Sequence, residues 1–431
     1  MNIRHLLLYR NFEEQELFNG ITELMEISEG EDLSFKENTG ELYKYANQLI
    51  ELAGRFGFRG NIWRNFLAYI LANHENAFST SCEITREPLE GLKKIALNDF
   101  GIFRELFCFD ITKIDRAFGV NCFSMLENFE NNQVESKVYN CGIRDSICQL
   151  GTDLFNAEDA KAYYEIITDF YHSHGVGILG LHKAFRLKEE ATGFRVMPVN
   201  NTQTIQLDDI IGYELQKKKL TDNTRAFVEG RPANNVLLFG DSGTGKSSSV
   251  KAILNEYYPQ GLRMVEVYKH EFRYLSELIE KIKDRNYRFI IYMDDLSFED
   301  YEIEYKYLKA IIEGGIAIKP DNVLIYATSN RRHLIREKWS DKEERTQDLH
   351  TSDTVQEKLS LAARFGVSIY FGSPDKKEFE RIVLELAGRH GLDTDREELL
   401  REANKWEVSH GGLSGRSAAQ FVSFMQGNSK K

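Results

Sequence analysis

The sequence predicts an α/β protein whose main domain is a three-layer α/β/α arrangement with a parallel sheet, preceded by a mainly α-helical domain and followed by a helical lid. Two patterns predict it. From residue 234 onward, short apolar runs alternate with amphipathic runs, as in βαβ units whose sheet is covered by helices on both faces. Before residue 190, apolar residues recur mostly at the helical spacings of three and four.

The length of the chain also indicates more than one domain. A hydrophobic core rarely grows beyond about 250–300 residues, and this chain has 431. A stretch rich in turn-forming and β-branched residues separates the two patterns and is typical of a linker. We therefore expect a helical domain over 1–190, a linker over 191–206, the α/β domain over 207–373 and the helical lid over 374–431.

Continuous apolar runs in the second domain are typical of strands buried on both faces. They lie at 234–240, 262–269, 288–295, 322–330 and 365–372. The helices expected between them are 247–258, 272–284 and 303–315. A polar and charged stretch at 336–360 interrupts the alternation, and we expect it to be a long loop with a solvated face.

Composition excludes several classes of function. The net charge of −12 argues against non-specific nucleic-acid binding, which depends on basic side chains. No apolar run reaches the roughly 18 residues of a membrane span, and acidic residues follow the start too closely for a signal peptide. We therefore expect a cytoplasmic protein. The five cysteines form no close pairs, so we expect buried free thiols rather than a zinc site.

One motif carries specific chemistry. Gly240, four further residues and then Gly245, Lys246 and Ser247 form the complete P-loop pattern, between a predicted strand and a predicted helix. Its glycines let backbone amides face an anion, while the lysine reaches the outer phosphates of a nucleotide and the serine binds Mg²⁺. The candidate nucleotide-binding residues are Gly240, Asp241, Ser242, Gly243, Thr244, Gly245, Lys246, Ser247 and Ser248.

Two carboxylates end the buried strand at 288–295. In P-loop proteins a carboxylate at this position holds the magnesium shell, so Asp294 and Ser247 are the candidate metal-binding residues. Asp295 is the candidate base that activates the attacking water. An acidic loop after a strand would give the same pattern, but a P-loop earlier in the same sheet favours the functional interpretation.

These motifs resemble those of the AAA+ family of ATPases: residues 240–247 look like its Walker A motif, and 290–295 look like its Walker B motif. The resemblance implies further roles. Asn330 matches the sensor that holds the attacking water, Arg364 the arginine that enters a neighbouring subunit's site, and Arg416 the lid arginine that senses the γ-phosphate. Ile211 and Gly212 match the hydrophobic-glycine box beside the adenine. Arg331 and Arg332 compete with Arg364 for its role, and each of these arginines is otherwise an ordinary surface residue.

The sequence departs from most of the AAA+ family at one position. Asp295 stands where most members carry glutamate, and a shorter carboxylate lies farther from the water, which favours slow turnover. Glu299 is a second candidate for this role. The combination of residues 294–299, 326–335 and 357–366 looks like an uncharacterised bacterial family of predicted AAA+ ATPases, so the resemblance implies fold and nucleotide chemistry but no cellular task.

The leading functional hypothesis is an ATPase that binds Mg-ATP, forms a homo-oligomer, and uses ATP hydrolysis to change conformation and act on a protein partner through its N-terminal domain. A nucleotide-dependent switch or scaffold with slow hydrolysis is the alternative. A DNA-associated loader fits the acidic charge less well. A small-molecule kinase fits less well too, because the C-terminal helices and Asn330 match AAA+ features.

Overall fold

The computed structural model describes residues 3–30, 39–86, 88, 90–130, 140–200, 202–299, 302–313, 320–331, 334, 361–392 and 394–428. The predicted loop at 336–360 and Arg332 lie outside these residues. The chain divides into two compact units. We call them the helical unit (residues 1–182 and 198–202) and the sheet unit (residues 183–197 and 203–431).

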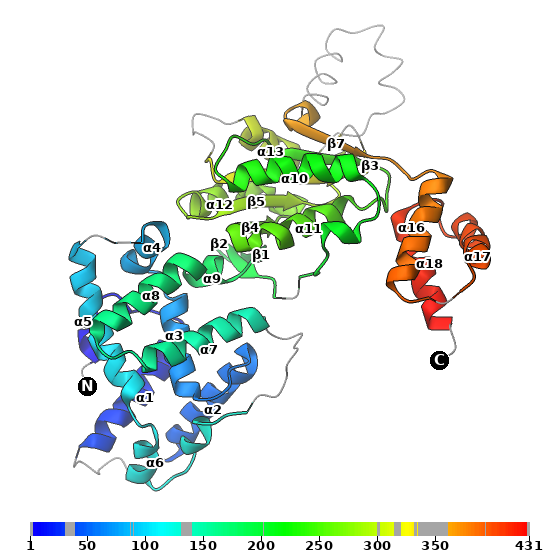
Figure 1. The fold of residues 1–431 in the computed structure, drawn as a ribbon. Helices are drawn as coiled ribbons and strands as arrows, with labels where there is room; N and C mark the ends of the chain where they lie inside the picture. Colours follow the sequence, from blue (N-terminus) through cyan, green and yellow to red (C-terminus); the bar gives the residue numbers. More distant parts are fainter. Residues whose placement is uncertain are drawn as a thin grey trace. The chain divides into compact units, whose positions relative to one another are not determined.

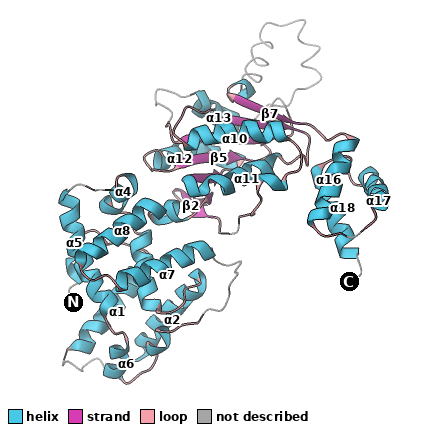
Figure 2. Ribbon diagram, in the orientation of Figure 1, coloured by secondary structure: helices cyan, strands magenta, loops and turns pink. Residues whose placement is uncertain are grey.

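The helical unit consists of helices and loops around one aromatic-rich core (Figures 1 and 2). Trp63 is buried in this core, and the indole donates a hydrogen bond to the Leu106 carbonyl at 3.0 Å. The helices are α1 (Gln15–Glu29), α2 (Thr39–Phe56), α3 (Ile62–Asn73), α4 (Ala77–Ile84), α5 (Glu90–Cys108), α6 (Thr112–Phe118), α7 (Cys141–Phe155), α8 (Ala160–His174) and α9 (Gly177–Leu181), with short 3₁₀ turns at Ile3–His5 and Ser124–Leu126.

Asparagine and aspartate side chains begin several of these helices. The Asn61 side chain accepts the Arg64 N–H before α3, and Asn140 accepts the N–H groups of residues 142 and 143 before α7. Such caps satisfy N–H groups that have no partner inside the helix. These caps therefore mark where α3 and α7 begin, within a stretch whose periodicity predicts helices.

The sheet unit is built on a seven-stranded sheet with the order β2-β1-β4-β5-β6-β3-β7. Its strands are β1 (Ala184–Glu190), β2 (Gly193–Pro198), β3 (Val236–Gly240), β4 (Leu262–Glu266), β5 (Arg288–Met293), β6 (Val323–Ser329) and β7 (Val367–Phe371). The pairings from β1 to β7 in this order are parallel. The carboxyl ends of β3, β5 and β6 therefore meet at one edge.

Helices cover the sheet, as the continuous apolar strands predict. Helices α10 (Glu214–Val228) and α11 (Lys246–Tyr257) share a core with one face of the strands. Helices α12 (Leu275–Ile282) and α13 (Glu304–Glu313) contact each other and also pack in the sheet unit (Figure 1). The lid helices α16 (Lys376–Arg389), α17 (Arg396–Ser409) and α18 (Gly415–Asn428) follow β7 and enclose a separate small core. Short 3₁₀ turns lie at Leu207–Asp209, Tyr258–Gln260 and Lys269–Tyr274.

The structure differs from the sequence prediction at residues 184–198. The sequence pattern places these residues at the end of the helical domain and in the linker, but they form β1 and β2 of the sheet, joined by a two-residue turn. Strand β1 pairs in parallel with β4. The buried residues Phe185, Leu187 and Phe194 explain the difference, because two short alternating runs carry only a weak strand signal.

Candidate nucleotide-binding site

Residues 240–247, which we call the P-loop, connect β3 to α11 at the edge where the parallel strands end. Gly240 has φ 134°, and a Cβ atom there would lie 2.1 Å from the Phe371 carbonyl oxygen. Only glycine lets β7 approach this closely. Asp241 strengthens the junction with β7: its N–H donates to the same carbonyl oxygen, and its Oδ2 accepts from the N–H and hydroxyl of Ser373 at 2.7 and 3.0 Å.

The backbone amides of the P-loop are available to an anion. Residues 242 and 243 form a turn. Among the described residues, no backbone hydrogen bond outside the helices and strands uses the N–H groups of residues 245–248. They lie at the N-terminus of α11, where the helix dipole also favours negative charge. Amides at a helix N-terminus fit a phosphate group.

Lys246 lies beside the same loop. Its Nζ donates to the carbonyl oxygens of Gly240 and Asp241, at 2.9 and 2.6 Å, and to Oδ1 of Asn330 at 3.0 Å. Burial lowers the pKa of this amine and the Arg416 charge lowers it further, whereas the carboxylates of Asp241, Asp295 and Asp294 raise it. A largely buried ammonium with polar partners fits a second negative ligand.

Asp294 receives three hydroxyl groups on one carboxylate oxygen. Ser247 Oγ, Tyr292 OH and Thr328 Oγ1 donate to Oδ1 at 2.7, 2.7 and 2.6 Å. Burial raises the pKa of Asp294, but these hydrogen bonds outweigh it, so that the net pKa is lowered. Among the described residues no donor meets Oδ2. An ionised carboxylate with a free oxygen, beside a serine hydroxyl, fits Mg²⁺.

Asp295 lies next to Asn330. Asn330 Nδ2 donates to Asp295 Oδ1 at 2.7 Å, so the amide side chain joins this carboxylate to Lys246. The Asp295 backbone has φ 48°, and its N–H donates to Thr328 Oγ1 at 2.9 Å. A non-glycine residue in this region of φ costs energy, and the Thr328 contact holds it there.

Strand register explains why these residues meet. Because β6 lies between β5 and β3, Ala327 pairs with Met293 and Ser329 pairs with Phe239. The residues that follow each strand are then Asp294 and Asp295 on one side of β6 and the P-loop on the other. Asn330, directly after β6, lies between the two.

A cavity of about 620 Å³ joins this edge to the lid. Residues that line it include most of the predicted set: Ile211, Ser242, Gly243, Thr244, Gly245, Lys246, Ser247, Ser248, Asp294, Asp295, Asn330 and Arg416. The apolar wall comes from Ile210, Ile382 and Leu386. An apolar wall beside a polar loop is the combination expected for a base and its phosphates.

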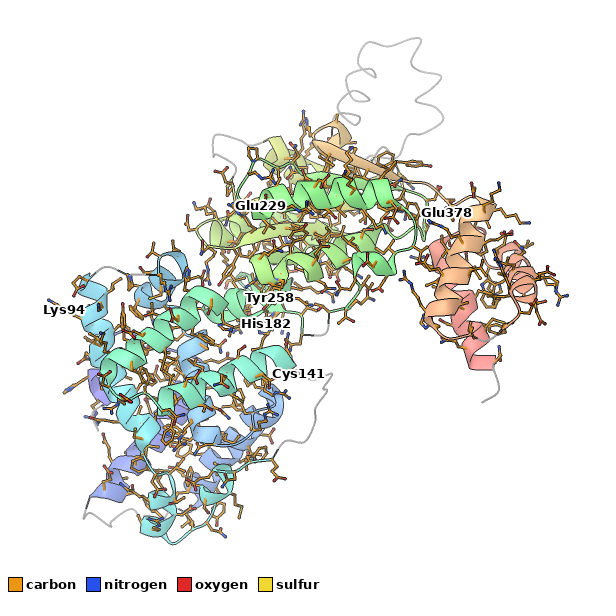
Figure 3. The ribbon with its side chains drawn as sticks, viewed as in Figure 1. Lys94, Cys141, His182, Glu229, Tyr258 and Glu378 are labelled. Atoms are coloured by element: carbon orange, nitrogen blue, oxygen red, sulfur yellow. The ribbon has the colours of Figure 1, made fainter. Side chains whose placement is uncertain are left out.

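The lid contacts the P-loop directly. The Arg416 N–H donates to the Gly243 carbonyl at 3.1 Å, and a Cβ atom on Gly243 would lie 3.0 Å from both Arg416 Cβ and Ser414 Oγ. Ile211 is buried in the lid core. Gly212 has φ 81°, and a Cβ atom there would lie 2.6 Å from Oε1 of Glu378, which Figure 3 labels on α16.

Other predicted residues lie away from the cavity. Arg364 precedes β7, at the amino edge of the sheet, whereas the P-loop lies at the carboxyl edge. The five-residue length of β7, about 16 Å, separates the two edges. Its own chain's cavity does not include it. Arg331 and Glu299 do not line the cavity either, and the Glu299 N–H donates to Glu302 Oε2 at 3.0 Å. Arg332 lies outside the described residues.

The sequence prediction misses two residues of the candidate site. Tyr292 and Thr328 donate to Asp294, yet the sequence motifs give roles only to the ends of their strands. A signal is present: Tyr292 lies two residues before Asp294, and Thr328 two before Asn330. Alternate strand residues share a face, so polar groups at these positions point toward the same site.

Comparison with known proteins gives the family. Residues 180–429 match the family described as Protein of unknown function (DUF815), which is more than half of the 431 residues. The chain belongs to the DUF815 family. As the sequence predicts, its sheet unit has the AAA+ fold, with β6 between the P-loop strand and the carboxylate strand and a helical lid after β7. No curated protein matches the chain.

Several solved structures are similar to about half of this DUF815 chain. The Thermotoga maritima RuvB Holliday junction branch migration motor is 18% identical, with a TM-score of 0.36 over 51% of this chain and 65% of its own. The FIGL-1 AAA domain in complex with ADP is 19% identical, with a TM-score of 0.35 over 52% of this chain and 73% of its own. The chain thus spans less than two thirds of the RuvB structure. In its described residues, no helix is long and apolar enough to cross a membrane.

Proposed function

We propose that this DUF815 protein binds ATP with Mg²⁺ in the cavity between the P-loop and the lid and hydrolyses it. The observation that carries the proposal is the joined set of Lys246, Asn330 and Asp295 beside Ser247 and Asp294, all at one sheet edge. The N–H groups of residues 245–248 at the start of α11 support it, because amides at a helix N-terminus suit a phosphate group.

Each residue has a role in this proposal. The P-loop amides and Lys246 hold the β- and γ-phosphates. Ser247 and Asp294 hold Mg²⁺, which when bound offsets charge on the phosphate oxygens. Asp295 accepts a proton from the attacking water. Asn330 orients the Asp295 carboxylate and the water. Ile211 contacts the adenine side of the cavity, and Arg416 reaches the γ-phosphate from the lid.

Arg364 suits a role between subunits. At the amino edge of its sheet it is too far to reach the phosphates of its own chain, so a catalytic contribution requires a second copy. We therefore include a homo-oligomer in the proposal. ATP turnover would move the lid, because the Arg416 N–H binds the Gly243 carbonyl, and this motion would act on a protein partner through the helical unit.

A slow ATP-dependent switch is the second candidate. Asp295 favours it, because its carboxylate is one methylene shorter than glutamate and is already hydrogen-bonded to Asn330. In this version nucleotide occupancy, rather than repeated turnover, sets the position of the lid.

Steady-state phosphate release with Mg-ATP, measured across protein concentrations, separates the two. For an oligomeric ATPase, the specific activity rises with protein concentration. Asp295→Asn and Arg364→Ala should each abolish it. Exposed Arg401 on α17, which lies outside the cavity, offers the matched control Arg401→Ala. Activity that is independent of concentration and unaffected by Arg364→Ala contradicts the shared site. Tight binding with no release above background supports the switch.

A further inference from the structure

The helical unit contains a cavity of about 940 Å³ that the ATPase proposal does not use. It lies between the start of α3 and the length of α7, with residues 127–130 closing one side. Two hydrogen bonds between the backbones of Gly60 and Phe129, at 2.8 and 3.0 Å, fix that side. Gly151 lets the two helices approach, because a Cβ atom there would lie 3.1 Å from Asn65 Oδ1.

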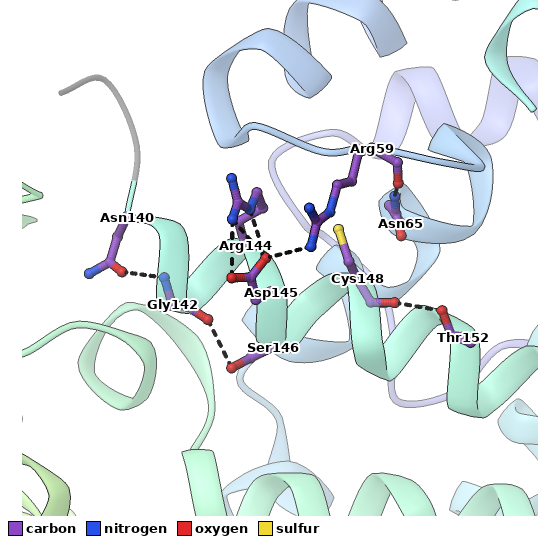
Figure 4. A network of polar contacts seen from close by, with 9 residues as sticks. All are labelled: Arg59, Asn65, Asn140, Gly142, Arg144, Asp145, Ser146, Cys148 and Thr152. Carbon is purple, nitrogen blue, oxygen red and sulfur yellow. Dashed lines mark hydrogen bonds and ion pairs between the residues drawn. The ribbon is translucent and has the colours of Figure 1, made fainter. Parts of the chain in front are cut away.

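Two of the arginines that line the cavity are held by one carboxylate (Figure 4). Arg144 is buried and donates through Nε and Nη2 to the two oxygens of Asp145, at 2.9 and 3.1 Å. Arg59 Nη2 donates to Oδ1 of the same residue at 3.2 Å. The Arg59 carbonyl in turn accepts from the buried Asn65 side chain at 2.8 Å. These contacts hold Arg59 and Arg144 on the same carboxylate at this wall of the cavity.

Arg64 is different. Its guanidinium carbon lies 3.3 Å from the centre of the Phe155 ring, so the group stacks on the aromatic face. Its Nε is buried, and within the described part of the chain no acceptor lies in hydrogen-bond reach of it. Burial lowers the pKa of Arg64, although the Glu127 charge opposes this effect. The rest of the Arg64 side chain lines the cavity and is only half-buried, so a charge-assisted hydrogen bond from this cation to an oxyanion would be favourable.

We propose that this cavity binds a small ligand through one oxyanion group, a carboxylate or a phosphate, held by Arg64. The stacked guanidinium presents its donors in a fixed plane, which matches two oxygens of such a group. Three arginines and the three acids Glu127, Glu130 and Asp145 line the cavity, so their formal charges cancel. This balance disfavours a polyanion such as a nucleic-acid strand, so the preference for one oxyanion rests on the stacked Arg64 guanidinium.

Protection of a thiol inside the cavity tests the proposal. Cys148 lines the cavity, whereas Cys108 is exposed and does not line it. The full-length chain would be treated with iodoacetamide at constant ionic strength in sodium chloride, sodium acetate or sodium phosphate, and mass spectrometry would follow each cysteine. An anion bound with a dissociation constant of about 10 mM slows Cys148 modification about tenfold at roughly 100 mM, as simple occupancy requires. Cys108 lies outside the cavity lining but its charge acts on Arg64, so its modification should slow by much less than that of Cys148.

Variants make the test specific. Arg64→Gln should abolish the protection, Arg64→Lys should retain part of it, and Arg116→Gln on the exposed surface of α6 should change nothing. Protection by acetate alone assigns a carboxylate, and protection by phosphate alone assigns a phosphate. Repeating the phosphate arm in Lys246→Ala excludes an effect from the P-loop. Equal Cys148 rates in all three salts, or protection that persists in Arg64→Gln, would overturn the proposal.

Discussion

The Thr328 hydroxyl donates to Oδ1 of Asp294 at 2.6 Å. The oxygen of this hydroxyl also accepts the N–H of Asp295 at 2.9 Å, so one side chain positions both carboxylates. Thr328→Val keeps the shape but removes both bonds. A hydrogen bond to a charged group contributes about 1.5–3 kcal/mol, so we expect ATP hydrolysis to slow about 10- to 100-fold.

Thr328→Ser is the matched control, because it retains the hydroxyl and loses only a methyl group. We expect its kcat to stay within about threefold of the wild type, since small cavities in a strand cost little. Steady-state kinetics of both variants provide the measurement. Equal losses in the two variants would show that packing, rather than the hydroxyl, is what matters at this position.

Asn330 and Asp295 form a second testable pair, joined by a 2.7 Å hydrogen bond. We expect Asp295→Asn to lower kcat by about 10²-fold or more, the usual contribution of an acid–base group. Asn330→Ala should cost about as much, because it removes the amide that positions the Asp295 carboxylate. The double variant should be barely slower than either single one, because residues that act as a unit are not additive. Losses that multiply would indicate independent roles.

The contact between lid and P-loop predicts a specific effect of a single methyl group. Gly243→Ala places Cβ 3.0 Å from Arg416 Cβ and from Ser414 Oγ, at φ 76°. The added methyl group would collide with the lid, so we expect the lid to be displaced and its contact with the P-loop to be lost. ATP affinity should then fall by about tenfold or more.

Gly261→Ala provides the comparison for this variant. Gly261 has φ 93°, but a Cβ atom there would meet no surrounding atom within 4 Å. The variant therefore carries the backbone strain without the steric conflict. ATP affinity, measured by equilibrium binding, should be unchanged in Gly261→Ala. Gly261 lies at the amino end of β4, away from the P-loop, so a similar loss in both variants would indicate a general loss of folding rather than the lid contact.

Asp294 predicts a dependence of stability on pH. Burial raises its pKa, but the hydrogen bonds from Thr328, Ser247 and Tyr292 lower it more, so the folded pKa lies below the unfolded value of about 3.9. The stability it contributes is therefore complete above about pH 5 and lost as the pH falls through the folded pKa. Hydrogen exchange of the β5 and β6 amides measures this stability. The wild type should be more stable than Asp294→Asn at about pH 5, and the difference should shrink as the pH falls to about 3. A constant difference would contradict this.

The parallel sheet, the P-loop and the carboxyl-end residues could be predicted from the sequence because each rests on a local pattern. A strand, a glycine-rich loop and a helix around Lys246 require no knowledge of distant contacts. The meeting of Asp295 with Asn330 follows from strand ends that share one edge. Strands β1 and β2 could not be predicted in the same way, because Phe185 and Phe194 lie in short alternating runs. Their burial depends on the pairing of β1 with β4 and of β2 with β1.

Tertiary contacts account for the remaining features. The Arg416 N–H on the Gly243 carbonyl joins residues that are far apart in the chain, and no local pattern encodes it. The position of Arg64 on Phe155 likewise depends on how α3 packs against α7. Local patterns therefore predict the chemistry of the nucleotide site, whereas the lid contact and the second cavity depend on tertiary packing.

Lys246 and its partners are central to the proposed binding and hydrolysis of Mg-ATP. The most direct test is single-turnover phosphate release from protein in excess over labelled ATP, alongside equilibrium binding, for wild type, Lys246→Ala and the exposed-lysine control Lys218→Ala. We predict that wild type and Lys218→Ala bind ATP and release phosphate, and that Lys246→Ala loses both. ATP bound equally by wild type and Lys246→Ala would contradict the proposal.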